Sequence, residues 1–380
     1  MHDPHGASPR LLVADDQSDV LEALRLLLSH QRYSLQFVTS PGALVDRARA
    51  EPWDAVLMDL NYTRDTTSGT EGLEALSQLR AEHQDLPIVV MTAWGNIELA
   101  VQAMRAGAQS FVQKPWDNLA LIQILDREIV QGRAARARTR HHEREQHDAL
   151  LIQRALMPAT LPVTARFEVV GAWQPAGTLG GDCYDVFTFT PDVLGLSIAD
   201  VAGKGLPAAL LMSSLQAAMR AFAGEVSLPQ VVCGSVNRLL CAQMISGRFV
   251  TMAYLRLDAA RGVLTYANAG HNPPLLARAD GRVEALHPSG TVLGVFSDAE
   301  YTGREVALRH GDRLLLYTDG VTEARNRDEE EFGEERLSAA LARHRHLSAA
   351  DLHTAVMEDV TRFATAGFQD DATLLAVAIR

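Results

Sequence analysis

The 380-residue chain has only three cysteines, Cys183, Cys233 and Cys241, and no two of them have Cys-x-x-Cys spacing. This number and spacing argue against a disulfide framework and a cysteine-based zinc site, and favour a reducing cytoplasm. The chain also lacks a run of about 18 apolar residues, and its first residues contain no apolar signal core. We therefore expect a soluble, cytoplasmic protein that does not enter a membrane.

Basic residues are outnumbered, with 35 Lys and Arg against 47 Asp and Glu, which gives a formal net charge of -12. A nucleic-acid-binding protein needs a basic face, so this balance argues against that class. Hydrophobic residues make up 47% of the chain, which is sufficient for packed cores. Acidic clusters in such a chain are suited to holding cations.

The length predicts two domains. We expect a tail at 1–9, a first domain at 10–126, a helical and possibly coiled-coil linker at 127–160, and a second domain at 161–380. In the first domain, short β-branched runs alternate with amphipathic stretches, which predicts an α/β doubly wound fold with five parallel strands. The predicted strands are 11–14, 35–39, 55–58, 88–91 and 110–113, and the predicted helices are 20–28, 44–50, 73–79, 97–104 and one that begins near 118.

Polar residues follow four of these strands: Asp15 and Asp16 after the first, Asp59 after the third, Thr92 after the fourth and Lys114 after the fifth. Because the carboxyl ends of parallel strands share one edge, these side chains should converge there. Three carboxylates can hold Mg²⁺, and a lysine and a hydroxyl can contact a phosphoryl group. Taken singly, each residue is equally well explained as a helix cap or a turn.

The segments LLVADD, VLMDLN, VMTAWG and SFVQKPWD together resemble the receiver domain of two-component response regulators over residues 10–127. The resemblance implies that Asp59 accepts a phosphoryl group from a sensor histidine kinase. It also implies that Asp15, Asp16, Asp59 and Asn61, the last through its carbonyl, hold Mg²⁺, and that Thr92, Phe111 and Lys114 report phosphorylation. The loop 61–69 is longer than is usual in that family.

Residues 127–147 are polar and free of proline, which predicts an exposed helix that ends at Met157-Pro158. Apolar residues at its two ends could form dimer seams, but a solvated helix that pairs with nothing is an equal alternative. The candidate seam residues are Leu119, Ile122, Leu125, Ile129, Leu150, Leu151 and Leu156.

The second half has short strands separated by Gly and Pro turns, which predicts an α+β sandwich of two antiparallel sheets flanked by helices. The predicted strands are 167–173, 193–199, 251–257, 263–267, 274–277, 312–317 and 373–378, and the predicted helices are 208–223 and 228–244. Acidic residues lie beside small residues at the strand ends, in Gly-Gly-Asp182, Asp200-Val-Ala-Gly, Asp319-Gly and Asp370-Asp371. Such carboxylates can hold two Mg²⁺ or Mn²⁺ ions about 3.5–4 Å apart, which activate water for attack on phosphorus.

Six segments occur in order, GGDCYDVF, ADVAGKGLPAALLM, GRFVTMAYLRLD, YANAGHNPP, YTDGVTEARN and DDATLL. Together they resemble the SpoIIE-type branch of the metal-dependent protein phosphatase (PPM) family over residues 150–379. The resemblance implies that Asp200 bridges two metals, that Asp182 and the Val201 carbonyl bind one, and that Asp319 and Asp370 bind the other. Asp371, which replaces the family's Asn, is the less favoured ligand.

Three further residues beside these motifs remain open. His271 is either a proton donor to the leaving oxygen or, more often in such a turn, a residue that fixes the loop. Cys183 is best explained by packing. Lys204 either orients phosphate or is solvated.

The resemblance further implies a hydrolase that removes phosphate from a serine or threonine of a STAS-domain anti-sigma-factor antagonist in partner switching, as a homodimer under Asp59 control. The alternative is a phosphorylation-gated adaptor that binds a sigma-pathway protein without hydrolysis. A DNA-binding response regulator is disfavoured, because no basic helix-turn-helix follows the first domain.

Overall fold

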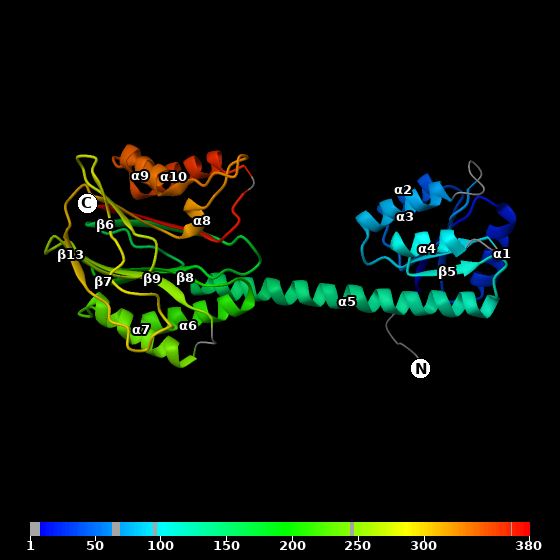
Figure 1. The fold of residues 1–380 in the computed structure, drawn as a ribbon, viewed down its shortest axis with the longest axis horizontal. Helices are drawn as coiled ribbons and strands as arrows, with labels where there is room; N and C mark the ends of the chain where they lie inside the picture. The colour runs from blue at the N-terminus through cyan, green and yellow to red at the C-terminus, as the bar shows by residue number, and fades with distance from the viewer. Residues whose placement is uncertain (1–7, 63–68, 94–96, 244–246, 366) are drawn as a thin grey trace. The chain divides into compact units, whose positions relative to one another are not determined.

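The computed structural model describes residues 8–62, 69–93, 97–243, 247–365 and 367–380. The chain divides into two compact units, Met1–Arg144 and Glu145–Arg380, which are described separately here (Figure 1). The boundary lies inside one helix. Among the described residues, no helix combines the length and the apolar character needed to cross a membrane.

The first unit is a five-stranded parallel sheet with the strand order β2-β1-β3-β4-β5. This is the doubly wound order in which ligands bind at the carboxyl edge, and it confirms the predicted fold. Helices α2, α3 and α4 cover one face, and α1 and α5 cover the other. The elements are β1 (Arg10–Ala14), α1 (Ser18–Ser29), β2 (Ser34–Val38), α2 (Pro41–Ala50), β3 (Ala55–Asp59), α3 (Thr70–Glu82), β4 (Ile88–Thr92), α4 (Ile97–Arg105), β5 (Ser110–Gln113) and α5 (Asn118–Leu156).

Helix α5 is a single 39-residue helix that ends directly before Met157-Pro158, as the proline predicts. Its first turns belong to the core of the first unit, where Leu121, Leu125 and Ile129 are buried against the sheet. Leu125 and Ile129 are therefore not available for a dimer seam, and that interpretation was wrong for these two residues. Among the other candidate seam residues, Leu119 is 70% exposed and Leu151 is 51% exposed.

The second unit contains two five-stranded antiparallel sheets with the orders β13-β10-β9-β8-β7 and β12-β11-β14-β15-β6. Their inner faces share one apolar core, and this sandwich confirms the predicted architecture. The strands are β6 (Phe167–Gln174), β7 (Cys183–Thr190), β8 (Val193–Val201), β9 (Val250–Asp258), β10 (Val263–Ala269), β11 (Leu275–Ala277), β12 (Val283–Ala285), β13 (Arg304–Ala307), β14 (Arg313–Tyr317) and β15 (Ala372–Ile379).

Helices cover both outer faces of the sandwich (Figure 1). Helices α6 (Leu206–Phe222) and α7 (Pro229–Gln243) pack on the sheet that contains β8 and β9. Helices α9 (Gly333–His344) and α10 (Ala349–Phe363) pack on the sheet that contains β14 and β15. The short α8 (Asp319–Thr322) follows β14. The predicted end of the second helix, Met244, lies outside the described residues.

Candidate functional site

The carboxyl edge of the first sheet gathers the side chains that the sequence predicted there. Asp15, Asp16 and Asp59 each offer a ligand atom, and these atoms lie within 4.8 Å of one another. Lys114 Nζ lies 2.7 Å from Asp15 Oδ2 and 2.9 Å from Asp59 Oδ2. Among the described residues, no other set of three or more acidic side chains has its ligand atoms this close together. The arrangement offers oxygen ligands to one hard divalent cation beside a fixed ammonium.

The electrostatics of this edge suit Mg²⁺. Burial raises the pKa of Asp59, although Lys114 opposes the shift. Asp59 and Asp15 raise the pKa of Lys114 despite its burial. Asp16 Oδ1 and Asn61 Oδ1 are buried without a hydrogen-bond partner among the described atoms. Because an unpaired buried oxygen is costly, a cation at this edge would relieve the repulsion and supply the contact that Asp16 Oδ1 lacks.

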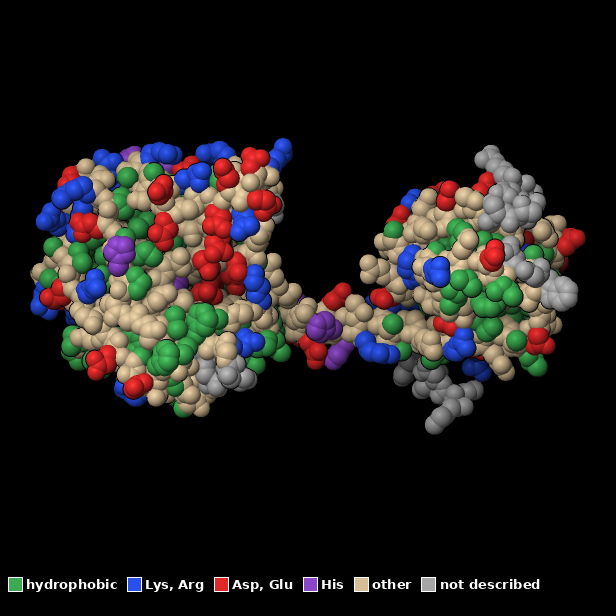
Figure 2. All heavy atoms as spheres, viewed as in Figure 1, with side chains coloured by type: hydrophobic (Ala, Val, Ile, Leu, Met, Phe, Trp, Pro, Cys, Tyr) green, Lys and Arg blue, Asp and Glu red, His purple; other side chains and the backbone are tan. Residues whose placement is uncertain are grey.

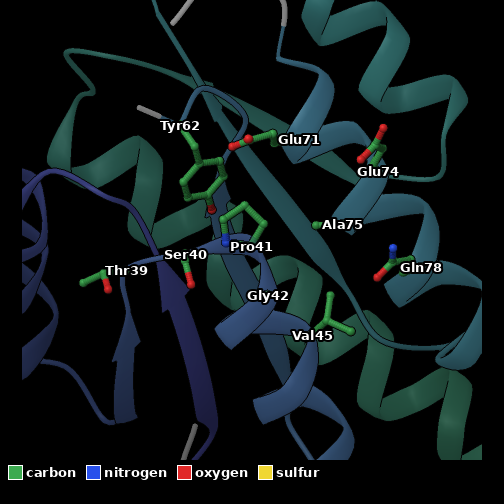
Figure 3. A pocket seen from close by; sticks show the side chains of 10 residues that line it. All are labelled: Thr39, Ser40, Pro41, Gly42, Val45, Tyr62, Glu71, Glu74, Ala75 and Gln78. Atoms are coloured by element: carbon green, nitrogen blue, oxygen red, sulfur yellow. The ribbon is translucent and has the colours of Figure 1, made fainter. Parts of the chain in front are cut away.

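The other two predicted receiver residues lie on β4 and β5. Thr92 ends β4 and is 2% exposed, while the Phe111 side chain on β5 is 49% exposed. The long loop after Asp59 lies largely outside the described residues, at 63–68. Tyr62 precedes it and points into a separate cavity of about 460 Å³ between the start of α2 and α3 (Figure 3). None of the predicted phosphoryl-contacting residues lines that cavity.

In the second unit, the four acidic loops meet at one end of the two sheets, and two glycines permit the close approach. A Cβ on Gly181 would lie 2.7 Å from the Val201 carbonyl oxygen and 3.5 Å from Asp200 Oδ1. A Cβ on Gly320 would lie 2.1 Å from the Asp371 carbonyl oxygen. The distances of 2.7 and 2.1 Å to carbonyl oxygens are too short for any side chain. The glycines beside Asp182 and Asp319 therefore allow these loops to lie directly against their neighbours.

Asp182 is the most deeply buried of these acids, at 1% exposure. Its Oδ2 accepts hydrogen bonds from the hydroxyls of Thr318 and Thr373, each at 2.6 Å. Burial, with Asp200 nearby, nevertheless raises its pKa. The two threonines orient the carboxylate, and sequence reasoning missed this role, although both residues stand inside the YTDG and DDAT motifs.

Asp200, Asp319 and Asp370 form the remaining charged group. Burial raises the pKa of Asp200 to about 7, with Asp319 and Asp370 as the next causes. Burial and Asp370 likewise raise the pKa of Asp319. Figure 2 shows acidic side chains gathered in a strip on this face of the unit, with basic side chains at its edge. The carboxylates outnumber the basic side chains beside them, where Lys204 pairs with Asp370, and they are more widely spaced than those of the first unit. Both properties suit more than one divalent cation.

Asp370 and Asp371 differ in their environments. Both carboxylate oxygens of Asp371 accept backbone N–H groups, from Ala176 at 2.9 Å and Gly181 at 2.7 Å. Asp370 instead forms an ion pair with Lys204, with 2.9 Å between Nζ and Oδ2, and its side chain is 39% exposed. Asp371 therefore stabilises the glycine loop, while Asp370 is accessible to a cation.

Because burial and then its acidic neighbours disfavour ionisation of Asp200, the metal-free protein should lose stability as pH rises. A carboxyl in an unfolded chain has a pKa of about 3.9. The folded chain holds the Asp200 proton more tightly, so this stabilisation is full below the unfolded pKa and is lost as pH rises through about 7. We expect the calorimetric Tm to fall by at least roughly 2–4 °C between about pH 5 and pH 8.

Divalent cations supply the matching test of this pH dependence. Mn²⁺ should raise the Tm more at the higher pH, because the carboxylates are then free of protons. A metal-free Tm that does not change with pH, or a Mn²⁺ effect that is larger at low pH, would contradict the assignment of the raised pKa to Asp200.

His271 and Cys183, two of the residues whose roles the sequence left open, lie in environments that favour a structural role. His271 is 2% exposed, its ring Nδ1 lies 2.8 Å from Thr251 Oγ1, and its backbone N–H donates to Asn268. Burial lowers its pKa to about 4, so the imidazole is uncharged near neutral pH, and the geometry favours the loop-fixing interpretation. Cys183 is buried, and burial raises its pKa, which favours packing over a reactive thiol.

Gln153, in the last turn of α5, is a residue that sequence reasoning did not assign to the site. Its side chain is buried and makes two hydrogen bonds with Gly180, donating to the carbonyl at 2.6 Å and accepting from the N–H at 3.2 Å. Gly180 lies two residues before Asp182. The end of α5 therefore directly supports the loop that carries a predicted metal ligand.

Two family models match the chain. The model described as Stage II sporulation protein E (SpoIIE) matches residues 190–380, and the response regulator receiver domain matches residues 11–126. Asp200, Asp319, Asp370 and Asp371 lie within the first range, while Asp182 precedes it. The receiver residues from Asp15 to Lys114 lie within the second range.

Individual proteins are also similar to this chain. The chain is 30% identical to phosphoserine phosphatase RsbU of Bacillus subtilis over 228 residues, covering 60% of this chain and 67% of RsbU. It is 27% identical to protein IcfG of Synechocystis sp. over 255 residues, covering 60% of this chain but only 40% of IcfG. The structure of the SiaA-PP2C domain of Pseudomonas aeruginosa has a TM-score of 0.56 at 25% identity and covers 64% of this chain and 99% of that domain.

Proposed function

Because the chain belongs to the SpoIIE family and carries a response regulator receiver domain, we propose that it is a protein serine/threonine phosphatase controlled by phosphorylation of Asp59. The observation that supports this most strongly is the meeting of four acidic loops at one end of the sandwich, with the pKa values of Asp182, Asp200 and Asp319 all raised. Such a cluster is costly unless cations bind to it.

The proposed ligands are those that the family resemblance implies. Asp200 would be shared between two ions, Asp182 and the Val201 carbonyl would hold one, and Asp319 and Asp370 would hold the other. Mg²⁺ or Mn²⁺ at these oxygens supplies Lewis acidity and lowers the pKa of water. Thr318 and Thr373 hold Asp182 in position, and Asp371 fixes the glycine loop. In the receiver, Asp15, Asp16, Asp59 and the Asn61 carbonyl bind Mg²⁺.

The substrate and partners follow from the family. RsbU, the relative named above, is a phosphoserine phosphatase. For this chain we infer a phosphorylated STAS-domain anti-sigma-factor antagonist as substrate, a sensor histidine kinase as phosphodonor, and a homodimer. The domain limits that accompany this proposal are 10–126, 127–160 and 161–380. A purely binding adaptor has no need for four mutually repelling carboxylates, and these residues favour the enzyme.

The experiment that tests the proposed function is release of phosphate from a phosphorylated STAS protein by the full chain with Mn²⁺. We expect multiple turnovers that a chelator abolishes and that added Mn²⁺ restores. Binding of the phosphoprotein without any release of phosphate would refute the phosphatase and support the adaptor.

Gln153 links helix α5 to the loop that carries Asp182. Its replacement by Ala should therefore uncouple the phosphatase site from the receiver domain. In the first unit, α5 is held by Arg133, whose guanidinium makes 2.8 Å bonds to Asp54, and by Arg136, which donates to the Trp53 carbonyl. In the second unit it is held by Gln153. Without Gln153, the buried polar groups of Gly180 lose their partners, at a cost of about 1–3 kcal/mol.

We therefore expect Gln153→Ala to lower kcat by about tenfold, the effect of roughly 1.4 kcal/mol, and to remove most of the response to phosphorylation at Asp59. Steady-state rates with and without a small-molecule phosphodonor measure both effects. Arg154→Ala, at the next and exposed position of α5, is the matched control. Retention of the full response in Gln153→Ala would exclude this route of control.

A further inference from the structure

A cavity of about 230 Å³ adjoins the acidic cluster, and it is lined by cations as well as by acids. Lys204 and Arg325 approach it from two different loops, one before α6 and one after α8. The full lining consists of Lys204, Gly320, Glu323, Arg325, Gln369 and Asp370. The cavity therefore shares Asp370 with the proposed metal site and places two positive groups beside it.

Lys204 is in a position to change partners. Its Nζ lies 2.9 Å from Asp370 Oδ2 and donates to the Gln369 carbonyl at 3.0 Å, while the side chain is 66% exposed. Once ionised, Asp182, Asp200, Asp319 and Asp370 would carry four negative charges, which two divalent cations would balance. With Asp370 engaged by a cation, the ammonium of Lys204 is left without a counter-charge at the mouth of the site. An anionic ligand can then take the place of Asp370.

Arg325 provides a more rigid positive group. Its two terminal nitrogens are held by Glu331 at 2.7 Å and Glu329 at 3.5 Å, and its backbone pairs with Glu331 in an isolated bridge. These contacts fix the guanidinium at the edge of the cavity, where its side chain is 37% exposed. A fixed planar guanidinium loses little entropy when it binds a phosphate oxygen, which is why arginine favours such ligands.

We propose that Lys204 and Arg325 form the subsite that binds the phosphoryl oxygens of the substrate monoester and, after hydrolysis, inorganic phosphate. This inference rests on the proposed function and adds to it the groups that hold the substrate anion. Both would contact the substrate phosphoryl group directly, and neither belongs to the proposed metal ligands. A purely local role, in which Lys204 balances Asp370 and Arg325 closes its own loop, is the competing explanation.

The test is titration calorimetry of inorganic phosphate into the Mg²⁺-saturated full chain and into the variants Lys204→Met and Arg325→Met. We expect each variant to weaken phosphate binding by about tenfold, the typical effect of removing one charge-assisted hydrogen bond. The affinity for Mg²⁺ itself should be unchanged in Arg325→Met, and unchanged or tighter in Lys204→Met, because the ammonium competes for Asp370. Arg343→Met is the control, since Arg343 is 64% exposed on α9 and pairs only with Asp359 among the described residues.

The possible results distinguish failure of the phosphate subsite from failure of the phosphatase activity. Phosphate affinities that match the native chain in both variants would overturn the subsite, as would a native Mg²⁺-loaded chain that binds no phosphate. The proposed function is judged separately, by Mn²⁺-dependent turnover of p-nitrophenyl phosphate. A chain that binds phosphate through Lys204 and Arg325 but does not hydrolyse this ester would retain the subsite and lose the phosphatase.

Discussion

Asp200→Asn should reduce the Mn²⁺-dependent release of phosphate by at least about 10²–10³-fold, which corresponds to several kcal/mol of transition-state stabilisation. Asp200 is the proposed shared ligand, and its carboxylate faces Asp319, Asp370 and Asp371. An amide has a similar shape but carries no negative charge, so it cannot balance two cations. Initial rates with a phosphorylated STAS protein and with p-nitrophenyl phosphate should fall together, because the loss affects the chemistry common to both substrates.

The same substitution should stabilise the metal-free protein above pH 7. Asn removes a buried charge whose burial and acidic neighbours disfavour ionisation, so the folded chain loses less stability as pH rises, and Asp182 and Asp319 account for the loss that remains. A urea titration at about pH 8 without metal should therefore give a higher midpoint for Asp200→Asn than for the native chain. Asp192→Asn, at a surface residue paired with Arg166, is the matched control. Full turnover by Asp200→Asn would remove Asp200 from the metal site.

The receiver was predictable because its signals are local and repeated. Each of its central strands is a short apolar run, and the buried strand β3 ends on Asp59 itself. Since parallel strands align their carboxyl ends, the order of motifs along the chain was sufficient to bring Asp15, Asp59 and Lys114 together. The structure confirms this convergence with contacts of 2.7 and 2.9 Å.

The partners of α5 were less predictable, because a helix with apolar residues at its ends has the same pattern whether it pairs with another helix or with a sheet. Leu125 and Ile129 fit a dimer seam by spacing, but they are buried against the first sheet. The sheet was the nearer apolar surface. Periodicity specifies which face of a helix is apolar, but it does not specify what covers that face.

In the second unit, some elements were absent from the prediction because they lack a clear pattern, and others were absent although they carry one. Strand β13 (Arg304–Ala307) is an edge strand with three of its four residues exposed, so no apolar alternation marks it. Helix α10 did carry a signal, because Ser348 caps it by accepting from the Asp351 N–H at 3.1 Å. The role of Asp371 depends on its contact with Gly181, and that of Gln153 on its contact with Gly180. Sequence spacing does not predict contacts between residues this far apart in the chain.

Asp59→Asn should abolish phosphoryl transfer to the chain and, with it, the control of the phosphatase. Asp59 is 2% exposed, and its carboxylate lies beside Lys114 and the two other receiver acids. In the proposed function its side chain would be the nucleophile that forms the acyl phosphate, and an amide oxygen is a poor nucleophile for that step. Incubation with Mg²⁺ and a small-molecule phosphodonor, followed by intact-mass measurement, should show one added phosphoryl group on the native chain and none on Asp59→Asn.

Phosphorylation of Asp59 should also change the phosphatase rate of the second unit. A coupling free energy of about 1–3 kcal/mol between two sites changes a rate or affinity by about 5–150-fold, so phosphorylated and unphosphorylated native chains should differ by at least about fivefold in steady-state phosphatase rate. Asp59→Asn should have one rate under both conditions. Asp46 is an exposed acid on α2, and Asp46→Asn should behave as the native chain does.

The phosphoryl group would add negative charge at an edge already crowded with carboxylates, where Lys114 contacts Asp15 and Asp59. A shift of Lys114 toward that group would alter β5 and the start of α5. Equal native rates with and without the acyl phosphate would mean that this local change does not reach the loop at Gly180.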